Sequence, residues 1–396
     1  MHDFMNHCLH AWLRATGWDE HNQFSSLHSP SKAILDFAIP RGFLVTASKH
    51  AFPHLASSVT FAPVPSTRSS TLDLSYLYTS RSLNLPSPHQ RPHADLSRPL
   101  PEEEPLDEQG KSIHIGSSLL YGRLFMPTAD LEAMWVRRWS QRTLIRCMAF
   151  SSAKAAPNPS SVMDGDQGPL TALLHSADLG FVSGHLEYDG GRWSMEAMGN
   201  SDDALLGLRA LYNFPRKESL SHADDMSIEE VAQGPDGEGM VIKEDGEGLR
   251  PSSIPTVSAW SVGGEMYYTG KEHSGGLSLG GRYRQTLPRL YEVTMTANPI
   301  LGHLSTAYTL SAWRNTLLLS SRYEFNLHSY ESDVCAGAEW RSGEDGVVRV
   351  RFGLREGLRL IFDGKYGRAW FAFGVGVGGE GKASTGKLGL QVQFIG

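Results

Sequence analysis

The sequence predicts an all-β protein that closes into a barrel, and three observations support this. Apolar residues recur with a period of two through most of the chain after residue 41, which is the period of a strand with two unlike faces. Between Arg41 and Gly396 roughly 19 or 20 such segments of about 8 to 11 residues follow one another without a helical pattern between them. No run approaches the roughly 18 apolar residues of a membrane-spanning helix. So long a meander favours a closed barrel over a sandwich.

The first 40 residues form a separate helical segment. Apolar side chains recur there at helical spacing, and Gly17 suits the end of a helix. A second apolar piece, Lys32–Pro40, stops at its proline. We therefore divide the chain into an N-terminal helical segment, 1–40, and a barrel, 41–396. The residues at helical spacing are Phe4, Cys8, Leu9, Trp12 and Leu13.

Five strands are especially clear. In the last of them Leu388, Leu390, Val392 and Phe394 share one face. Short turns join the strands, and the glycine-containing sequences at Asp189, Glu344, Arg355 and Phe362 are typical of hairpins. The five strands are Thr71–Thr79, Gly276–Gln285, Val347–Arg355, Ala369–Val377 and Lys387–Gly396.

Three segments interrupt the meander, and their composition predicts exposed, disordered loops. Residues 81–115 contain six prolines, 151–167 are small and polar, and 215–253 are acidic. Between Glu218 and Glu247 ten Asp or Glu face one Lys, a balance of -9 within a chain of net charge -7. The remainder therefore sums to +2, so the barrel itself is close to neutral.

The chain carries no convincing enzyme motif. "GVGVGG" (Gly374–Gly379) fits a dinucleotide fingerprint, but the chain ends 17 residues later, before the acidic residue that this fingerprint needs. "GKASTGKL" (Gly381–Leu388) lacks the Ser or Thr that holds magnesium in a P-loop. The 16 histidines and three cysteines have no metal-ligand or disulfide spacing. We expect no enzyme, cofactor or metal.

Two sets of side chains have both an ordinary and a functional interpretation. Tyr76 with Tyr78, and Tyr323 with Phe325, lie two apart on strand faces, as in a membrane-interface girdle or a docking face for another protein. A set of arginines on the opposite face suits either a plain polar lumen or a passage for anions. These lumen-lining candidates are Arg282, Arg284, Arg349, Arg351 and Arg355.

Several stretches together resemble the fungal mitochondrial distribution and morphology protein 10 family. They are the N-terminal "FMNHCLHAWLRATGWDEHNQF", "ILDFAIPRG", "LSYLYTS", "NPILGHLSTAY", "SRYEFNLHSYESD" and the terminal strand. The resemblance implies a 19-stranded outer-membrane barrel similar to the mitochondrial porins, with a short helix in or near the lumen. First and last strands would then pair in parallel. It also implies that Tyr76, Tyr78, Tyr323 and Phe325 are partner-docking candidates.

The resemblance further implies a scaffold at sites where mitochondria contact the endoplasmic reticulum. Its partners would be the soluble lipid-transfer subunits and membrane anchor of the encounter structure, the core barrel and peripheral subunits of the sorting and assembly machinery, and phospholipids. Nucleic acid is not among them. These roles serve phospholipid exchange, mitochondrial morphology and inheritance, and maturation of barrel proteins including the import channel.

The terminal strand also has the spacing of a mitochondrial β-signal, polar-x-Gly-x-x-apolar-x-apolar. The matching residues are Lys387, Gly389, Val392 and Phe394. An extended segment of this kind pairs with an open sheet edge through its backbone, while alternate side chains give specificity. Two alternatives to the scaffold stay open: a porin-type metabolite or anion channel on the same fold, and a soluble all-β enzyme or carbohydrate binder.

Overall fold

A computed structural model describes most of the chain. The described residues are 4–40, 42–63, 70–83, 115–152, 180–215, 217–219, 256–287, 290–313, 316–342, 346–378 and 386–396. Most of the three predicted loops, 81–115, 151–167 and 215–253, lies outside these residues, so their disorder stays a prediction.

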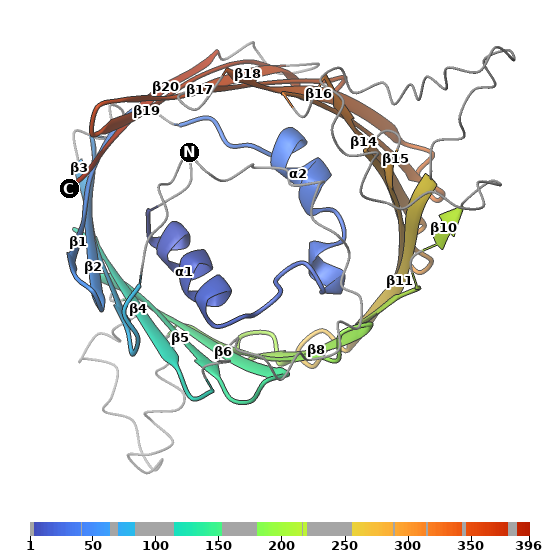
Figure 1. The fold of residues 1–396 in the computed structure, drawn as a ribbon, viewed down its shortest axis with the longest axis horizontal. Helices are drawn as coiled ribbons and strands as arrows, with labels where there is room; N and C mark the ends of the chain where they lie inside the picture. The colour runs from blue at the N-terminus through green and yellow to red at the C-terminus, as the bar shows by residue number, and fades with distance from the viewer. Residues whose placement is uncertain are drawn as a thin grey trace, which may run out of the picture.

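The strands form one continuous sheet that curves into a closed ring (Figure 1). In the first half of the barrel they are β1 (Gly42–Phe52), β2 (Leu55–Pro63), β3 (Ser70–Thr79), β4 (Ser118–Met126), β5 (Asp130–Arg138), β6 (Thr143–Ser151), β7 (Phe181–Asp189), β8 (Trp193–Asn200), β9 (Leu205–Asn213) and β10 (Lys217–Ser219). In the second half they are β11 (Thr256–Thr269), β12 (Ser274–Leu287), β13 (Tyr291–Asn298), β14 (His303–Ala312), β15 (Leu317–Asn326), β16 (Ser332–Ser342), β17 (Gly346–Gly353), β18 (Gly357–Tyr366), β19 (Ala369–Val377) and β20 (Lys387–Ile395).

The wall of the barrel is nineteen strands around, as expected. Strand β10 does not add another, because it continues β9 along the same edge of β11. Asn213 of β9 lies opposite Ser261, and Lys217 of β10 lies opposite Ser258, so the register shifts by only one residue between the two pieces. The described strands therefore close as a 19-stranded barrel.

The barrel closes through a parallel pair. Strand β1 runs beside β20, with Gly42 opposite Gly389 and Ser48 opposite Ile395, while the other neighbouring strands pair antiparallel. An odd number of alternating strands requires one parallel contact at the seam. Closure gives backbone donors and acceptors of the first and last strands partners within the sheet, as a wall surrounded by hydrocarbon needs.

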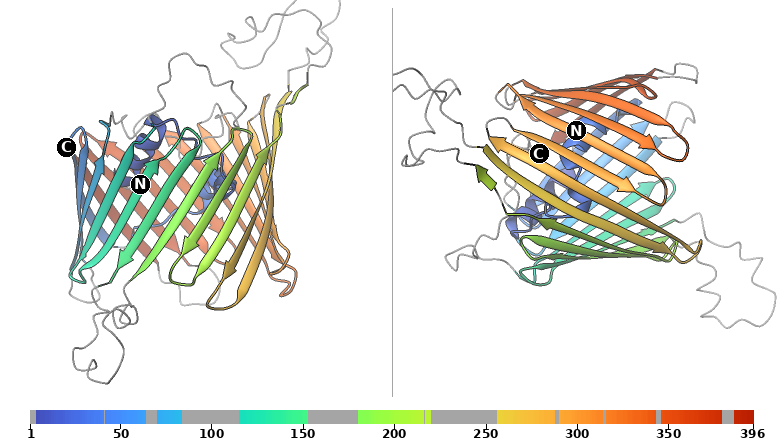
Figure 2. Two further views of the ribbon diagram at one scale, coloured as in Figure 1. Left: turned by 90° about the horizontal axis from the view of Figure 1, so that it is seen from below. Right: turned by 90° about the vertical axis from the view of Figure 1, so that its right-hand side faces the viewer.

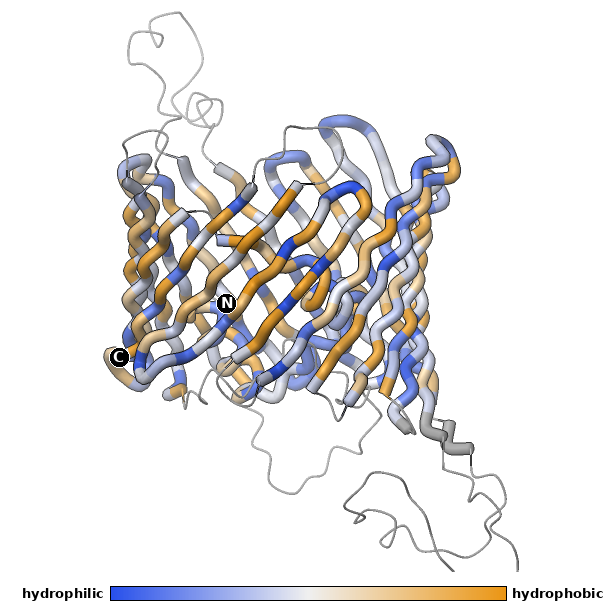
Figure 3. The backbone as a smooth tube through the Cα atoms, turned by 90° about the horizontal axis from the view of Figure 1, so that it is seen from above, coloured by the Kyte–Doolittle hydropathy of each residue, from blue (hydrophilic) through white to orange (hydrophobic). Residues whose placement is uncertain are grey.

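The two faces of the wall have opposite character. On β17 the side chains of Val348, Val350 and Phe352 point outward, whereas Arg349 and Arg351 point into the lumen and are 4% exposed. Figure 3 shows the same alternation of polar and apolar residues around the barrel. A soluble protein buries its apolar face, so this inverse arrangement is the one expected of a barrel in a bilayer.

The N-terminal segment lies inside the barrel (Figures 1 and 2). It contains helix α1 (Phe4–Ala15), the short helix η1 (Phe24–Ser26) and helix α2 (Ser29–Leu35). Gly17 ends α1 as predicted, with a φ of 72° and with the Trp18 N–H donating to the Leu13 carbonyl at 2.9 Å. None of the described helices is long and apolar enough to cross a membrane.

Two local predictions were wrong. No turn forms at Phe362, which lies inside β18. Asp363 faces the lumen there and accepts a hydrogen bond of 2.8 Å from Arg349. The strand predicted to reach Arg355 ends at Gly353, and residues 354–356 form the hairpin turn. The turns predicted at Asp189 and Arg355 are present, and the one at Glu344 lies outside the described residues.

Candidate functional site

The luminal arginines of β12 are buried beside polar side chains. Arg282 is held by the Ser261 hydroxyl at 3.3 Å, and Arg284 donates to Glu292 at 2.7 Å. Both guanidinium groups are on the luminal face, and their partners are side chains of the neighbouring strands. The pair Arg284–Glu292 is nearly closed to solvent, so its two charges largely cancel.

The luminal arginines of β17 are held in the same way, and one of them contacts the N-terminal segment. Arg349 pairs with Asp363 at 2.8 Å and with Glu339 at 3.3 Å. Arg351 donates to the backbone carbonyl of Leu35, the last residue of α2, at 2.7 Å. A wall arginine therefore fixes the end of an inner helix.

Arg355 lies apart from the other four arginines. It is in the exposed turn between β17 and β18, at one end of the barrel, and approaches Glu331 in the neighbouring turn at 3.4 Å. The structure thus places four of the five lumen-lining candidates on strand faces and the fifth on the rim.

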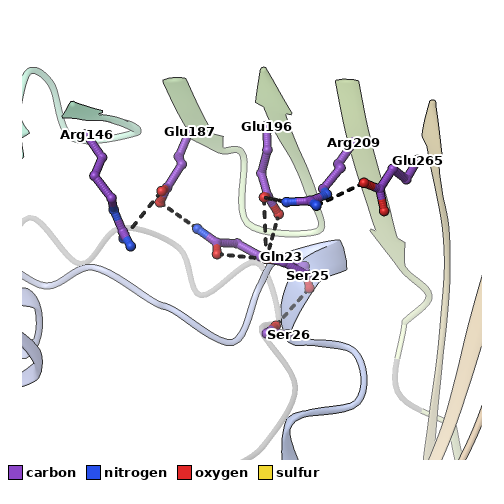
Figure 4. Close-up of polar contacts among 8 residues, drawn as sticks. All are labelled: Gln23, Ser25, Ser26, Arg146, Glu187, Glu196, Arg209 and Glu265. Atoms are coloured by element: carbon purple, nitrogen blue, oxygen red, sulfur yellow. Dashed lines mark hydrogen bonds and ion pairs between the residues drawn. The ribbon is translucent and has the colours of Figure 1, made fainter. Parts of the chain in front are cut away.

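Hydrogen bonds attach the middle of the N-terminal segment to β7 and β8 (Figure 4). Gln23 donates to Glu187 at 2.6 Å, and Ser25 donates to Glu196 at 3.3 Å. Arg146 of β6 contacts Glu187 at 3.4 Å from the other side. Each carboxylate therefore has both a partner on the inner segment and a cation on the wall, since Arg209 of β9 reaches Glu196 at 3.5 Å.

Asn22 is the most enclosed polar anchor of the segment, at 1% exposed. Its amide nitrogen donates to Asp189 and to the Gly191 carbonyl, both at 2.7 Å, and its oxygen accepts from Asn213 at 2.8 Å. Three polar atoms on two parts of the wall thus determine its position. Loss of one partner would leave a buried polar group unpaired.

Helix α2 is anchored at both ends. His28, just before the helix, makes a 2.9 Å hydrogen bond with Thr294 of β13. Asp36, just after it, accepts two hydrogen bonds of 2.8 Å from Arg322 of β15. A two-bonded guanidinium–carboxylate pair fixes orientation as well as distance, so α2 has a defined place on the wall.

Helix α1 is attached by apolar packing instead. Its side chains form one buried cluster with luminal residues of β2 to β6, and Trp12 is 0% exposed. From the helix the cluster takes Phe4, Met5, Cys8, Leu9, Trp12 and Leu13, and from the strands it takes Ala56, Leu77, Leu119, Val136 and Leu144.

Sequence analysis did not single out Asn22, Glu187 or Glu196. A partial signal was present, because Glu187 and Asp189 are two residues apart on one strand and so share a face. Their partners, however, lie more than 160 residues away. Only the closed barrel brings these residues together, and a period of two does not reveal which strand an inner segment will meet.

The aromatic pairs lie on the outer wall. Tyr76 is 56% exposed, Tyr78 and Tyr323 are also exposed, and the Tyr323 and Phe325 rings stack with centroids 6.5 Å apart. Strands β3 and β15 are on different sides of the barrel (Figure 1). The structure brings the members of each pair together and keeps the two pairs apart.

The terminal strand divides its β-signal residues between the faces. Val392 and Phe394 are on the outward face, Lys387 is exposed at the start of β20, and Gly389 is buried on the luminal face. Strand β20 pairs with both β19 and β1. The residues of the pattern therefore lie at the barrel seam.

Comparison with known proteins identifies the family. Residues 1–347 match the family model described as Mitochondrial distribution and morphology protein 10. The chain belongs to this family. A member from Laccaria bicolor is 29% identical over 100% of this chain and 99% of its own length. Members from Phaeosphaeria nodorum and Yarrowia lipolytica are 33% and 30% identical, over 86% and 92% of this chain and 79% and 90% of their own lengths.

As a member of this family, the chain is a structural barrel of a mitochondrial family. The glycines that resemble a dinucleotide fingerprint fit this identity. Gly374 and Gly376 lie within β19, so they form part of the wall and do not open a helix. The P-loop-like stretch, Gly381–Leu388, lies mostly outside the described residues.

Proposed function

We propose that this chain is a scaffold of the mitochondrial outer membrane. In this role it anchors the ER–mitochondria encounter structure, with its lipid-transfer subunits and its anchor in the endoplasmic reticulum. It also assists the sorting and assembly machinery as barrel proteins mature, the import channel among them. Family membership supports both roles.

The observation that carries the proposal is the occupied lumen. The segment from Phe4 to Pro40 is attached to the wall by an apolar cluster and by buried hydrogen bonds. A segment attached at so many points narrows the pore, whereas a conduit for metabolites needs an open, water-filled lumen. This favours a scaffold over a porin-type channel.

The outer wall supplies two separated surfaces for the two assemblies. Tyr76 and Tyr78 present one, and Tyr323 and Phe325 the other. Exposed aromatic side chains contribute strongly to protein interfaces, and a distance of many strands between the pairs allows two partners to bind without overlap. The terminal strand, with its β-signal residues, would direct the chain's own insertion by strand addition.

Affinity purification from mitochondria tests the scaffold role. The Tyr76→Ala/Tyr78→Ala and Tyr323→Ala/Phe325→Ala variants should each lose one partner set by about fivefold or more and keep the other. Leu206→Ala/Leu208→Ala is a matched control, because these residues are also exposed and two apart on one strand, β9. If both aromatic variants retain both partner sets at the control's level, the docking assignment is refuted.

Planar-bilayer recording of the purified protein tests the channel alternative. We expect small conductance from the intact chain because the N-terminal segment occupies the lumen. A large, steady, anion-selective conductance would instead support the channel. The luminal arginines would then be its selectivity-determining groups.

A further inference from the structure

Six glycines of the wall face the lumen where the N-terminal segment lies. At each of them a Cβ atom would come within 3.1 Å of a side-chain or backbone atom of residues 24–40 or overlap it. Wall atoms also approach three of the six this closely, but at luminal glycines elsewhere, such as Gly207 and Gly276, the nearest atoms all belong to wall side chains, Met198 and Tyr267. The six are Gly263, Gly280, Gly337, Gly374, Gly376 and Gly389, and we name them the glycine track.

The first two positions of the track lie beneath η1. Gly263 of β11 and Gly280 of β12 are cross-strand partners. A Cβ atom on Gly263 would lie 2.7 Å from the Phe24 ring, and one on Gly280 would lie 3.1 Å from the same ring and 3.0 Å from Leu27. The wall itself is as close, with the Ala210 carbonyl oxygen 2.4 Å from the first Cβ position and Thr296 2.9 Å from the second. Two adjacent glycines thus leave a shallow site in the wall that the Phe24 ring fills.

The third position lies beneath the end of α2. A Cβ atom on Gly337 of β16 would lie 2.9 Å from Leu35. The Leu35 carbonyl is the acceptor for Arg351, and the next residue, Asp36, pairs with Arg322. The close approach permitted by Gly337 therefore brings the helix end within reach of both arginines.

The last three positions receive the linker into the barrel. Ile39 would lie 2.8 Å from a Cβ on Gly374 and 2.6 Å from one on Gly376, while a Cβ on Gly389 would overlap the Pro40 carbonyl group. Phe37 packs nearby on Ile361 and Ala372. The contact at Gly389 is with backbone, which cannot rotate away as a side chain can.

We propose that the glycine track is a docking site for the chain's own residues 22–40, which form a fixed inner strap. We further propose that Gly389, the glycine of the β-signal, has a second role as the final position of this site. Because Gly389 is on β20, the strap can complete its docking only after β20 has entered the sheet. Seating of the strap thus follows barrel closure and keeps the pore narrowed.

Gly376→Leu tests the site, because among the atoms near Gly376 only Ile39 would be closer than 3.7 Å to a new Cβ. Cys335 provides the readout: it is on the luminal face of β16, two residues from Gly337, and 4% exposed. In a Cys8→Ala/Cys147→Ala background we expect Gly376→Leu to speed alkylation of Cys335 by a small charged thiol reagent about tenfold or more. Adding Ile39→Ala should restore the parent rate, since it returns the lost volume.

Gly281→Leu is the matched control, since Gly281 faces outward on β12 beside luminal Gly280, and the nearest atom to its Cβ position, the Ser261 carbonyl oxygen, is 3.7 Å away. Folding of every variant is checked by heat-dependent gel mobility. Equal rates for Gly376→Leu, Gly281→Leu and the parent would overturn the proposal. So would an acceleration by Gly376→Leu that Ile39→Ala does not relieve, because the glycine would then matter to the sheet alone.

Refolding into detergent micelles tests the order of events. Closure is followed by gel mobility, and docking is followed by protection of Cys335 in samples pulsed with the same reagent. Protection should appear together with closure or after it. Protection that precedes closure would overturn the role assigned to Gly389.

Discussion

The two parts of the N-terminal segment are attached to the wall by different physical means. Helix α1 rests on an apolar patch of β2 to β6, whereas residues 22–36 add to their apolar contacts hydrogen bonds with carboxylates, amides and arginines of β7 to β17. Apolar packing is strong but not directional, while hydrogen bonds to charged groups fix position and orientation. The difference teaches that the lumen wall has two regions. One holds α1 by apolar packing, and the other also sets the position and orientation of residues 22–36 by hydrogen bonds.

The largest expected effect comes from Trp12→Ala. It removes the most deeply buried large side chain of α1 and leaves a cavity, so the docking of this helix should weaken by about 3–5 kcal/mol. Cys8 is in the same cluster and 0% exposed, so its alkylation as the sole thiol measures the opening. Arg14→Ala, on the exposed side of the same helix, is the control. If the two regions are independent, Trp12→Ala leaves the rate at Cys335 unchanged.

Asp36→Asn should have a smaller effect and on the other region. It removes one charge from the pair with Arg322, and we expect a loss of about 1–3 kcal/mol in the docking of α2. Alkylation of Cys335 should accelerate, and that of Cys8 should not. Glu324→Gln is the control, because Glu324 also contacts Arg322, at 3.1 Å, but belongs to the same strand. Equal effects of the two variants would show that Asp36 does not anchor the helix.

The smallest effect is a pH dependence at His28. Burial, followed by the nearby charges of Lys32 and Arg322, lowers the pKa of His28 to about 4 from its ordinary 6.5. The undocked segment then binds more protons between pH 6.5 and 4, so docking is complete above pH 6.5 and weakens as the pH falls towards 4. At pH 5.5 the expected loss is on the order of 1 kcal/mol, seen as faster alkylation of Cys335 relative to the same measurement on His28→Gln. A His28→Gln protein with the parent's pH dependence would assign the effect to another group.

The sequence was sufficient to predict the strands of the barrel wall, but not the contacts between the wall and the N-terminal segment inside it. Strand β19 was predicted with its observed bounds, Ala369–Val377, because alternation and flanking glycines are local signals. Helix α1 was also predicted, since its apolar residues recur along one face. The contacts of Asn22 and Gln23 were not, because they depend on which strand lies opposite the inner segment after closure.

Local chemistry also misled where a residue type serves two purposes. Aspartate followed by glycine is typical of turns, yet Asp363 and Gly364 are inside β18, where the carboxylate pairs with Arg349. The glycines of β19 are a related case: Gly374 and Gly376 match part of a dinucleotide fingerprint that the sequence analysis rejected, and the structure places Ile39 against them. In both cases the residue type is explained by a contact with another part of the chain.

The parallel seam gives the molecule a sidedness. Because β1 and β20 run in the same direction, the barrel starts at one rim, at Gly42, and finishes at the other, beyond Ile395. A reporter fused after Gly396 would therefore lie on the same membrane face as the β5–β6 turn at Ser140. An epitope inserted into the β8–β9 turn at Asp202 would lie on the opposite face. In the proposed outer-membrane location, a protease added to intact mitochondria should reach only one of these two labels, and the one it reaches would establish which rim meets the cytosol.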